Sequence, residues 1–223
     1  MQEIIGLLGV KGAGKDTAAA VMVKHFGFRR VAFADALYRE TAEAFGVTVE
    51  FLNNRDTKET PQSALCLANC RVPGFIATVM DAAVAAGLTI DLLTPLSARY
   101  VLQLWGTEYR RIREGYDSYW LDRVNDIVDR SPSVNFIATD VRFINEARYI
   151  EHRPQGRLVR VRRPELEEAE ARNRAAKGTA AHRSEVELLT YPTSFEVLNL
   201  ENHQAYLETS LVFWYEHTRR IAA

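Results

Sequence analysis

The chain has 223 residues, which is enough for one α/β domain with a sizeable buried core. Its 47% apolar and 26% charged residues are ordinary for a globular protein, and a formal net charge of −1 gives no general attraction to nucleic acids or anionic membranes. No apolar run approaches the ~20 residues of a membrane-spanning helix, and the N-terminus lacks a secretion signal. We therefore expect a cytoplasmic protein with neither nucleic-acid nor membrane partners, in which Cys66 and Cys70 are reduced structural thiols.

The N-terminal segment is the most informative part of the chain. The apolar run Ile4–Leu8 indicates a buried strand; Gly9, Gly12 and Gly14 form a glycine-rich turn, and Lys15 leads into helix-forming residues. Backbone N–H groups of such a turn can surround an anion at the helix N-terminus, and the lysine adds positive charge for β- and γ-phosphates. The Gly-x4-Gly-Lys spacing satisfies most of the phosphate-binding loop pattern and predicts that the chain binds a nucleoside triphosphate.

One residue departs from that pattern. Asp16 stands where a Ser or Thr usually supplies a hydroxyl to Mg²⁺. A carboxylate beside transferred phosphates is repelled unless it binds Mg²⁺, accepts a proton from a substrate hydroxyl or points away. Thr17 could supply the hydroxyl one residue later, or Asp16 could bind the metal through water, and the sequence leaves both open. The predicted ATP-binding residues are Gly9, Lys11, Gly12, Ala13, Gly14, Lys15, Asp16 and Thr17.

Apolar and amphipathic segments alternate along the rest of the chain. Strands are predicted at 28–33, 134–138, 157–161 and 195–198. Helices are predicted at 35–45, 98–113, 118–130, 144–151, 164–177 and 204–219, with short helices inside 62–97. This alternation indicates an α/β fold with a doubly wound, mostly parallel sheet.

One of these helices carries a polar stripe, because Arg99, Gln103, Thr107 and Arg111 recur every four residues. Two guanidinium groups and an amide on a common stripe suit a phosphate and the edge of a base. A solvated helix face is the plainer explanation of such charges. Gly106 costs about 1 kcal/mol relative to alanine in a helix interior, which points to a close approach by another group.

Two carboxylates follow predicted strands. Asp140 stands just past the carboxyl end of a buried strand, where ligand sites of open α/β sheets lie, and such a carboxylate can hold a magnesium-bound water in phosphoryl transfer. Arg142 could clamp a phosphate. The alternative is that Asp140 caps the following helix while Asn145 and Glu146 are solvated. Asp35 ends the second strand, on the edge of the sheet where the loop lies, and either caps a helix or contacts an acceptor nucleotide.

The stretch 160–185 combines many basic side chains with a run of glutamates. It could be a lid that brings an arginine over the transferring phosphoryl group. It could equally be a solvent-facing helix with i,i+4 ion pairs, and the sequence favours neither. His182 is expected to be structural rather than catalytic.

Together these segments resemble the deoxynucleoside monophosphate kinases of tailed bacteriophages. The matching segments keep their order over most of the chain: Gly9–Thr17, Phe33–Asp35, Arg99–Arg111 with its Gln-x-x-Gly-Thr-Glu core, Asp140–Glu146 and His182–Glu185. The Lys-Asp-Thr end of the loop is a normal variant in this family and in the similar phosphomevalonate kinases. The resemblance implies a single kinase domain over 1–223 with a phosphate-binding loop, a helical insertion at about 47–97 and a lid at about 163–185. No motif aligns with 62–97.

The resemblance also implies a reaction, namely transfer of the ATP γ-phosphoryl group to a deoxynucleoside 5′-monophosphate with Mg²⁺ as cofactor. It permits a homodimer and, for a phage-encoded protein, places it in the host cytoplasm. The implied catalytic residues are Lys15, Asp16 and Arg142. The implied acceptor contacts are Asp35, Arg99, Gln103, Arg111 and Asp140. The implied Mg²⁺ ligands, directly or through water, are Asp16, Thr17 and Asp140.

Two other functions stay open at this point. The nearest is another small-molecule kinase with a phosphate-binding loop, similar to phosphomevalonate or dephospho-coenzyme A kinases, which a panel of acceptors would separate. A non-enzymatic ATP-binding switch or DNA-packaging partner is less favoured. The chain lacks the Asn-Lys-x-Asp signature of guanine-binding switches and the basic charge of a DNA-binding domain.

Overall fold

The structure is a computed structural model of the chain, and it describes all residues except 178–182, 201–202 and 223. The described residues form two compact units. The first combines Met1–Phe33 with Val124–Ala223, and the second is the intervening segment Ala34–Arg123. The chain therefore leaves the first unit after its second strand and returns to it within a helix, and the predicted insertion at 47–97 lies inside the second unit.

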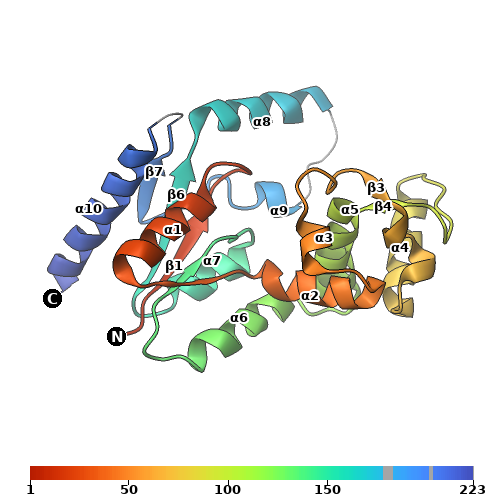
Figure 1. Cartoon of the computed structure of the whole chain (residues 1–223), viewed down its shortest axis with the longest axis horizontal. Coiled ribbons are helices and arrows are strands. Elements are labelled where there is room, and N and C mark those ends of the chain that lie inside the picture. Colours follow the sequence, from red (N-terminus) through yellow and green to blue (C-terminus); the bar gives the residue numbers. More distant parts are fainter. Residues whose placement is uncertain (178–182, 201–202, 223) are drawn as a thin grey trace. The chain divides into compact units, whose positions relative to one another are not determined.

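The first unit is built on a five-stranded sheet in which all neighbouring strands are parallel (Figure 1). The spatial order is β2-β5-β1-β6-β7. The strands are β1 (Ile4–Leu8), β2 (Arg29–Val31), β5 (Phe136–Ala138), β6 (Gly156–Arg162) and β7 (Phe195–Leu198). The predicted α/β fold with a mostly parallel sheet is confirmed. Because β1 pairs with both β5 and β6, the carboxyl ends of these three strands lie side by side at one edge.

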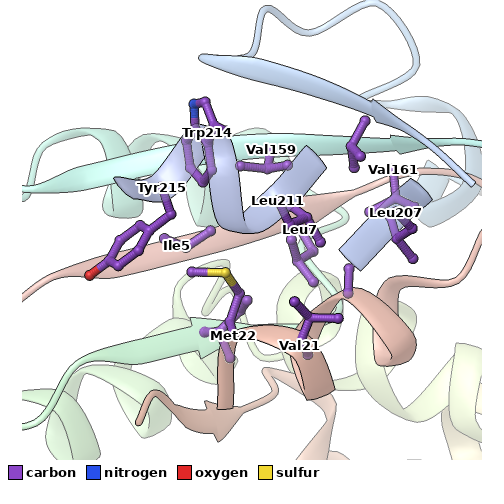
Figure 2. Packing of buried hydrophobic residues seen from close by; sticks show 14 of the residues in the cluster. Ile5, Leu7, Val21, Met22, Val159, Val161, Leu207, Leu211, Trp214 and Tyr215 are labelled. Atoms are coloured by element: carbon purple, nitrogen blue, oxygen red, sulfur yellow. The ribbon is translucent and has the colours of Figure 1, made fainter. Parts of the chain in front are cut away.

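Side chains of β1 point alternately to the two faces of the sheet. Ile5 and Leu7 lie on the face covered by α1 (Lys15–Phe26) and α10 (Gln204–Ala222), where apolar side chains from strands and helices interdigitate (Figure 2). The labelled members of this cluster are Ile5, Leu7, Val21, Met22, Val159, Val161, Leu207, Leu211, Trp214 and Tyr215. This core fixes the direction in which α1 leaves the strand edge.

The opposite face is covered by α7 (Ile144–Glu151), and Gly6 allows its close approach. A Cβ atom at Gly6 would lie 2.5 Å from Ile150 Cδ1, and 2.9 Å from methyl groups of Leu158 and Val141. Apolar atoms therefore occupy the space that a side chain would need. Helices cover both faces of the sheet, which is the doubly wound arrangement that the sequence predicts.

The remaining helices of this part of the chain are α6 (Tyr119–Asp129), which begins in the second unit and ends in the first, α8 (Pro164–Lys177) and α9 (Arg183–Val186). The predictions for α7, α8 and β7 agree with the structure at both ends. β2 is shorter than the predicted strand at 28–33. As an edge strand it pairs only with β5, and β5 itself has three residues.

The second unit is mainly helical, and its elements are α2 (Ala34–Phe45), α3 (Val49–Asn53), 3₁₀ turns at Ser63–Leu65 and Leu67–Asn69, α4 (Pro73–Ala85) and α5 (Ala98–Gln103). Two short strands, β3 (Pro61–Gln62) and β4 (Leu96–Ser97), pair antiparallel. The sequence predicts the helices inside 62–97 but neither α3 nor this pair of strands. Both are too short to produce a periodic pattern.

The helix predicted at 98–113 changes its winding partway. It is an α-helix up to Gln103 and a π-helix from Leu104 to Arg113, and the Glu114 N–H still donates to the Tyr109 carbonyl five residues back, at 3.0 Å. Gly106 lies in the π-helical part. Its carbonyl accepts from Trp120 Nε1 at 2.9 Å, and a Cβ atom there would lie 3.2 Å from Leu37 Cδ2. The group that approaches Gly106 closely is therefore the protein itself.

A partly buried polar cluster centred on Glu40 holds the π-helical segment in place. The Glu40 carboxylate accepts from Trp105 Nε1 at 3.3 Å, from Arg110 Nε at 3.0 Å and from the Tyr119 hydroxyl. The Arg110 guanidinium lies over the rings of Tyr109 and Tyr119, 4.9 and 4.8 Å from their centroids. Glu40 thereby ties α2 to the π-helix and to the start of α6.

Two expectations from composition concern the whole chain. Cys66 and Cys70 are buried free thiols, each following a 3₁₀ turn, and burial raises the pKa of the Cys70 thiol. Over the residues that the structure describes, no helix combines the length and the apolarity needed to cross a bilayer.

The core in Figure 2 makes a stability prediction. Leu211 of α10 is 1% exposed, so the Leu211→Ala variant should lose about 2–5 kcal/mol of unfolding free energy through lost apolar contact and a residual cavity. Urea unfolding followed by circular dichroism measures this loss. Leu93→Ala is the matched control, because Leu93 is 73% exposed and its truncation should cost less than about 0.5 kcal/mol. Equal losses in the two variants would contradict this account of the core.

Candidate functional site

The turn between β1 and α1 has the backbone of a phosphate-binding loop. Gly9, Gly12 and Gly14 have φ values of +139°, +80° and +100°, a region that side-chain-bearing residues rarely adopt. A Cβ atom at Gly9 would lie 2.3 Å from the carbonyl oxygen of Val161, at the end of β6. The glycine spacing that the sequence displays is therefore required by conformation, and at Gly9 also by contact.

Lys15 closes this loop from inside the first turn of α1. Its Nζ donates to the carbonyl oxygens of Gly9 at 2.8 Å and Val10 at 2.9 Å. Burial, followed by the positive charge of Arg142, lowers the pKa of the Lys15 ammonium from 10.5 to about 8. The charges of Asp16, Asp140 and Glu170 act in the opposite direction. The ammonium is still mostly protonated at neutral pH and is surrounded by carbonyl groups that a more negative ligand can replace.

The structure brings Asp140 to the same edge of the sheet. Asp140 follows β5, is partly buried, and its Oδ1 accepts the backbone N–H of Phe33 at 2.9 Å, which ties the ends of β5 and β2 together. The negative charge of Asp140 raises the pKa of Lys15, and so does the charge of the exposed Asp16. Asp16 and Asp140 are therefore, with Glu170, within electrostatic reach of the loop lysine, while Thr17 is partly buried on the first turn of α1.

The segment after Asp140 differs from the capping alternative. Phe143 occupies the N-cap position of α7 without a side-chain cap bond, and the carboxylate of Glu146 accepts the N–H groups of Arg142 at 2.9 Å and Phe143 at 3.2 Å. Glu146 is 2% exposed, so the expectation that it is solvated is wrong, because the orphan N–H groups at the helix start need an internal acceptor. The Arg142 side chain is exposed, and its charge acts on Lys15.

Sequence reasoning misses one contact to the loop. Asn199 follows β7, and its Nδ2 donates to the carbonyl oxygen of Ala13 at 2.8 Å. Leu166 of α8 approaches the loop as well, since a Cβ atom at Gly12 would lie 3.2 Å from Leu166 Cδ1. The rule that singles out Asp140, a polar residue just past a parallel strand, also applies to Asn199 and could have found it.

The described part of the stretch 160–185 holds several internal ion pairs. Arg160 is buried and donates to the carbonyl oxygens of Leu188 at 3.1 Å and Tyr191 at 2.6 Å. Arg162 binds both oxygens of Glu167, at 2.8 and 2.9 Å from its Nε, and a further carboxylate on β7. The guanidinium groups of Arg160 and Arg162 therefore bind carbonyl and carboxylate groups of the protein itself. His182 and the rest of 178–182 lie outside the described residues, and the lid stays a prediction.

In the second unit, the predicted polar stripe lies on α5 and the π-helix. Arg99 is partly exposed, and its Nε donates to Glu59 Oε1 at 2.5 Å. Gln103 is partly buried, and Thr107 and Arg111 are buried. Arg111 donates to the Asp117 carbonyl at 3.1 Å and lies 3.6 Å from its carboxylate. The C-terminal half of the stripe is thus not a solvated helix face.

Asp35 lies in the second unit, exposed in the first turn of α2, where a negative charge interacts favourably with the helix dipole. Its carbonyl oxygen accepts from Arg39 Nε at 3.3 Å. The predicted acceptor contacts Asp35, Arg99, Gln103 and Arg111 belong to the second unit. The loop, Asp140 and Arg142 belong to the first.

The oxygen donors of the first unit fit Mg²⁺ in kind. Mg²⁺ prefers oxygen ligands and usually keeps several waters, so that one or two carboxylates and the phosphates of a substrate complete its shell. Asp16 and Asp140 supply carboxylates near the loop lysine, and Thr17 supplies a hydroxyl on the first turn of α1. Among the described residues no group of three or more His, Cys, Asp or Glu side chains could hold a metal by itself.

Comparison with known proteins gives a distant relative. A mimivirus protein (Acanthamoeba polyphaga mimivirus) named "Putative deoxynucleotide monophosphate kinase" is 28% identical over 200 residues, which cover 89% of this chain and 88% of that protein. The fold also resembles the crystal structure of TT1252 from Thermus thermophilus, with 15% identity, a TM-score of 0.46 and coverage of 96% and 97% of the two chains. No family model matches the chain. The mimivirus likeness supports a nucleotide kinase function.

The electrostatics of Lys15 can be tested directly. In the native protein its amine should titrate near pH 8, and neighbouring charges should move that pKa in opposite directions. Arg142→Ala should raise the pKa and Asp140→Asn should lower it, each by up to about one unit. The asparagine keeps an oxygen for the Phe33 N–H. NMR titration of ¹³Cε-labelled lysine reads the values, and a Lys15 that titrates near 10.5, or shifts of one sign in both variants, would refute the arrangement.

Proposed function

We propose that this protein is an ATP-dependent kinase that converts deoxynucleoside 5′-monophosphates into the diphosphates. The observation that carries the proposal is the loop of three positive-φ glycines at the N-terminus of α1, with the Lys15 ammonium inside it and the charges of Asp140 and Arg142 acting on that ammonium. The name of the 28% identical mimivirus relative supports nucleotides as substrates.

On the donor side, the loop amides and Lys15 bind the β- and γ-phosphates of ATP. In the structure, the Lys15 ammonium donates to the carbonyl oxygens of Gly9 and Val10. Anionic phosphate oxygens are stronger acceptors than carbonyls, so ATP binding exchanges these bonds for bonds between two ionised groups and raises the lysine pKa again. Lys11, Ala13 and the remaining loop residues complete the proposed ATP site.

On the acceptor side, Arg99 and Arg111 bind the phosphate of the monophosphate and Gln103 reads its base, with Asp35 and Asp140 as further contacts. Arg99 can exchange its partner readily, because Glu59 is more than half exposed and the guanidinium is reachable by solvent. Arg111 is enclosed and bonded to the backbone of Asp117. We therefore expect Arg99 to carry the larger share of acceptor affinity.

The reaction needs charge neutralisation more than proton transfer. An oxygen of the acceptor monophosphate attacks the γ-phosphorus, the bond from that phosphorus to the bridging oxygen of ADP breaks, and the electron pair leaves with ADP. The attacking oxygen is already anionic, so no strong general base is required. Lys15 and Arg142 offset the charge that crowds together as two anions meet in line. Mg²⁺, held through Asp16, Thr17 or Asp140, would supply further positive charge at the phosphates.

The deciding experiment is an acceptor panel. The protein with ATP and Mg²⁺ should phosphorylate at least one of the four natural deoxynucleoside monophosphates, because only a nucleotide kinase accepts them, and chromatography separates the diphosphate products. Phosphomevalonate and dephospho-coenzyme A serve as competing acceptors. Transfer only to one of these would assign a different small-molecule kinase, and ATP binding with transfer to none of them would favour a switch.

The loop lysine provides the internal control for this panel. Lys15→Ala should cut turnover at least about 100-fold, since it removes a cation at the transferring phosphates. Lys24→Ala on the same helix is the matched variant, because Lys24 is exposed and pairs with Glu208 at 2.9 Å. Turnover that Lys15→Ala leaves intact would contradict the assignment of the donor site.

The acceptor site is tested separately. Arg99→Ala should raise KM for the monophosphate about tenfold or more, through loss of a charge-assisted contact, and should leave KM for ATP nearly unchanged. Steady-state kinetics with each substrate varied in turn measure both constants. Arg113→Ala is the control, because Arg113 is exposed and pairs with Asp81 at 2.8 Å. If the two variants behave alike, Arg99 does not bind the acceptor.

A further inference from the structure

Asn199 links the end of the sheet to the loop through two hydrogen bonds. Its backbone N–H donates to the carbonyl oxygen of Arg162 at 2.8 Å, which continues the pairing of β7 with β6 past the last strand residue. Its side-chain Nδ2 donates to the carbonyl oxygen of Ala13 at 2.8 Å. Asn199 is thus fixed to the sheet by its backbone and bonded to the loop by its side chain.

The bond to Ala13 sets the orientation of a whole peptide plane. The Ala13–Gly14 peptide is trans, so its C=O and N–H groups point in opposite directions. With the carbonyl of Ala13 held against Asn199, the N–H of Gly14 must point to the side away from Asn199. A flipped peptide would present the carbonyl oxygen on that side instead, and a carbonyl dipole repels an anion where the N–H dipole attracts it.

The packing around Gly14 supports this role. A Cβ atom at Gly14 would lie 2.1 Å from Asn199 Nδ2, and the φ of Gly14 is +100°. The glycine therefore does more than permit a turn, because it leaves the space into which the Asn199 amide fits. Lys15 holds the carbonyls of Gly9 and Val10 in the same loop, so Asn199 and Lys15 together orient three of its carbonyl groups.

We propose that Asn199 is a positioning residue for polyphosphate binding, which orients the Ala13–Gly14 peptide so that the Gly14 N–H is available to the phosphates of ATP. The inference rests on the proposed function in so far as it takes ATP as the ligand of the loop. Asn199 acts through the loop backbone and not by touching the phosphates.

Binding assays test this role without any need for an acceptor. Isothermal titration with ATP, and with inorganic tripolyphosphate as the probe of the phosphates alone, should show about tenfold weaker binding by Asn199→Ala than by the native protein, the loss expected for one oriented hydrogen bond. Asn199→Asp should bind at least as weakly at pH 8, because its carboxylate faces the Ala13 carbonyl and cannot donate.

The affinity of the Asn199→Asp variant should depend on pH in a way that a purely structural role of Asn199 would not produce. The carbonyl of Ala13 faces the new carboxyl group of Asn199→Asp and raises its pKa, so part of this group is protonated at pH 5. The protonated form can donate a hydrogen bond to Ala13 again. The ratio of native to Asn199→Asp affinity should therefore shrink between pH 8 and pH 5. A ratio that stays constant over this range would overturn the proposal, even if the alanine variant were too unstable to assay.

Asn135→Ala is the matched control. Asn135 directly precedes β5, at the amino-terminal ends of the strands and away from the loop. Its Oδ1 accepts the N–H of Glu3 at 2.9 Å. This variant should lower the thermal unfolding midpoint and bind tripolyphosphate like the native protein. Affinity of Asn199→Ala within twofold of native, or native protein that binds neither probe, would overturn the inference. A native protein that binds both probes but phosphorylates no monophosphate would overturn only the proposed function.

Discussion

β1 pairs in parallel with β5 on one side and β6 on the other, and the arrangement of the loop, Asp140 and Arg142 depends on this pairing. It places three carboxyl ends at one edge of the sheet. The glycine loop leaves the first of them, Asp140 follows the second, and the carbonyl of Val161 at the third lies against Gly9. The buried face shared with α1 and α10 makes the pairing stable, since a shift by one residue would turn Ile5 and Leu7 away from that core.

Charges of both signs act on the lysine of the loop. Partly buried carbonyl oxygens accept from the Lys15 ammonium, the charge of Arg142 disfavours that ammonium, and the charges of Asp16 and Asp140 favour it. A bound triphosphate would add further negative charge beside this ammonium. The same low-dielectric surroundings that lower the lysine pKa would strengthen its attraction to phosphate oxygens, so burial serves the proposed chemistry in both states.

Arginine is abundant in this chain, yet its number says little about phosphate contacts. Arg160 and Arg162 bind backbone carbonyls and carboxylates of the first unit, and Arg110 is held by Glu40 among aromatic rings in the second. These guanidinium groups stabilise the ends of strands and the π-helix. Arg142 differs from them because its side chain is exposed at the edge of the sheet where the loop lies.

The sequence by itself determined the alternation of strands and helices, the parallel sheet and the loop, because burial periodicity and positive-φ glycines leave their marks within a few residues of one another. Only the tertiary structure decided which partners distant polar residues take. Asn199 lies 186 positions from Ala13, Glu146 turned inward to cap its own helix, and the stripe from Arg99 to Arg111 entered a π-helix packed around Gly106. Such contacts depend on which surfaces pack together in the folded protein, and a local sequence pattern does not predict this packing.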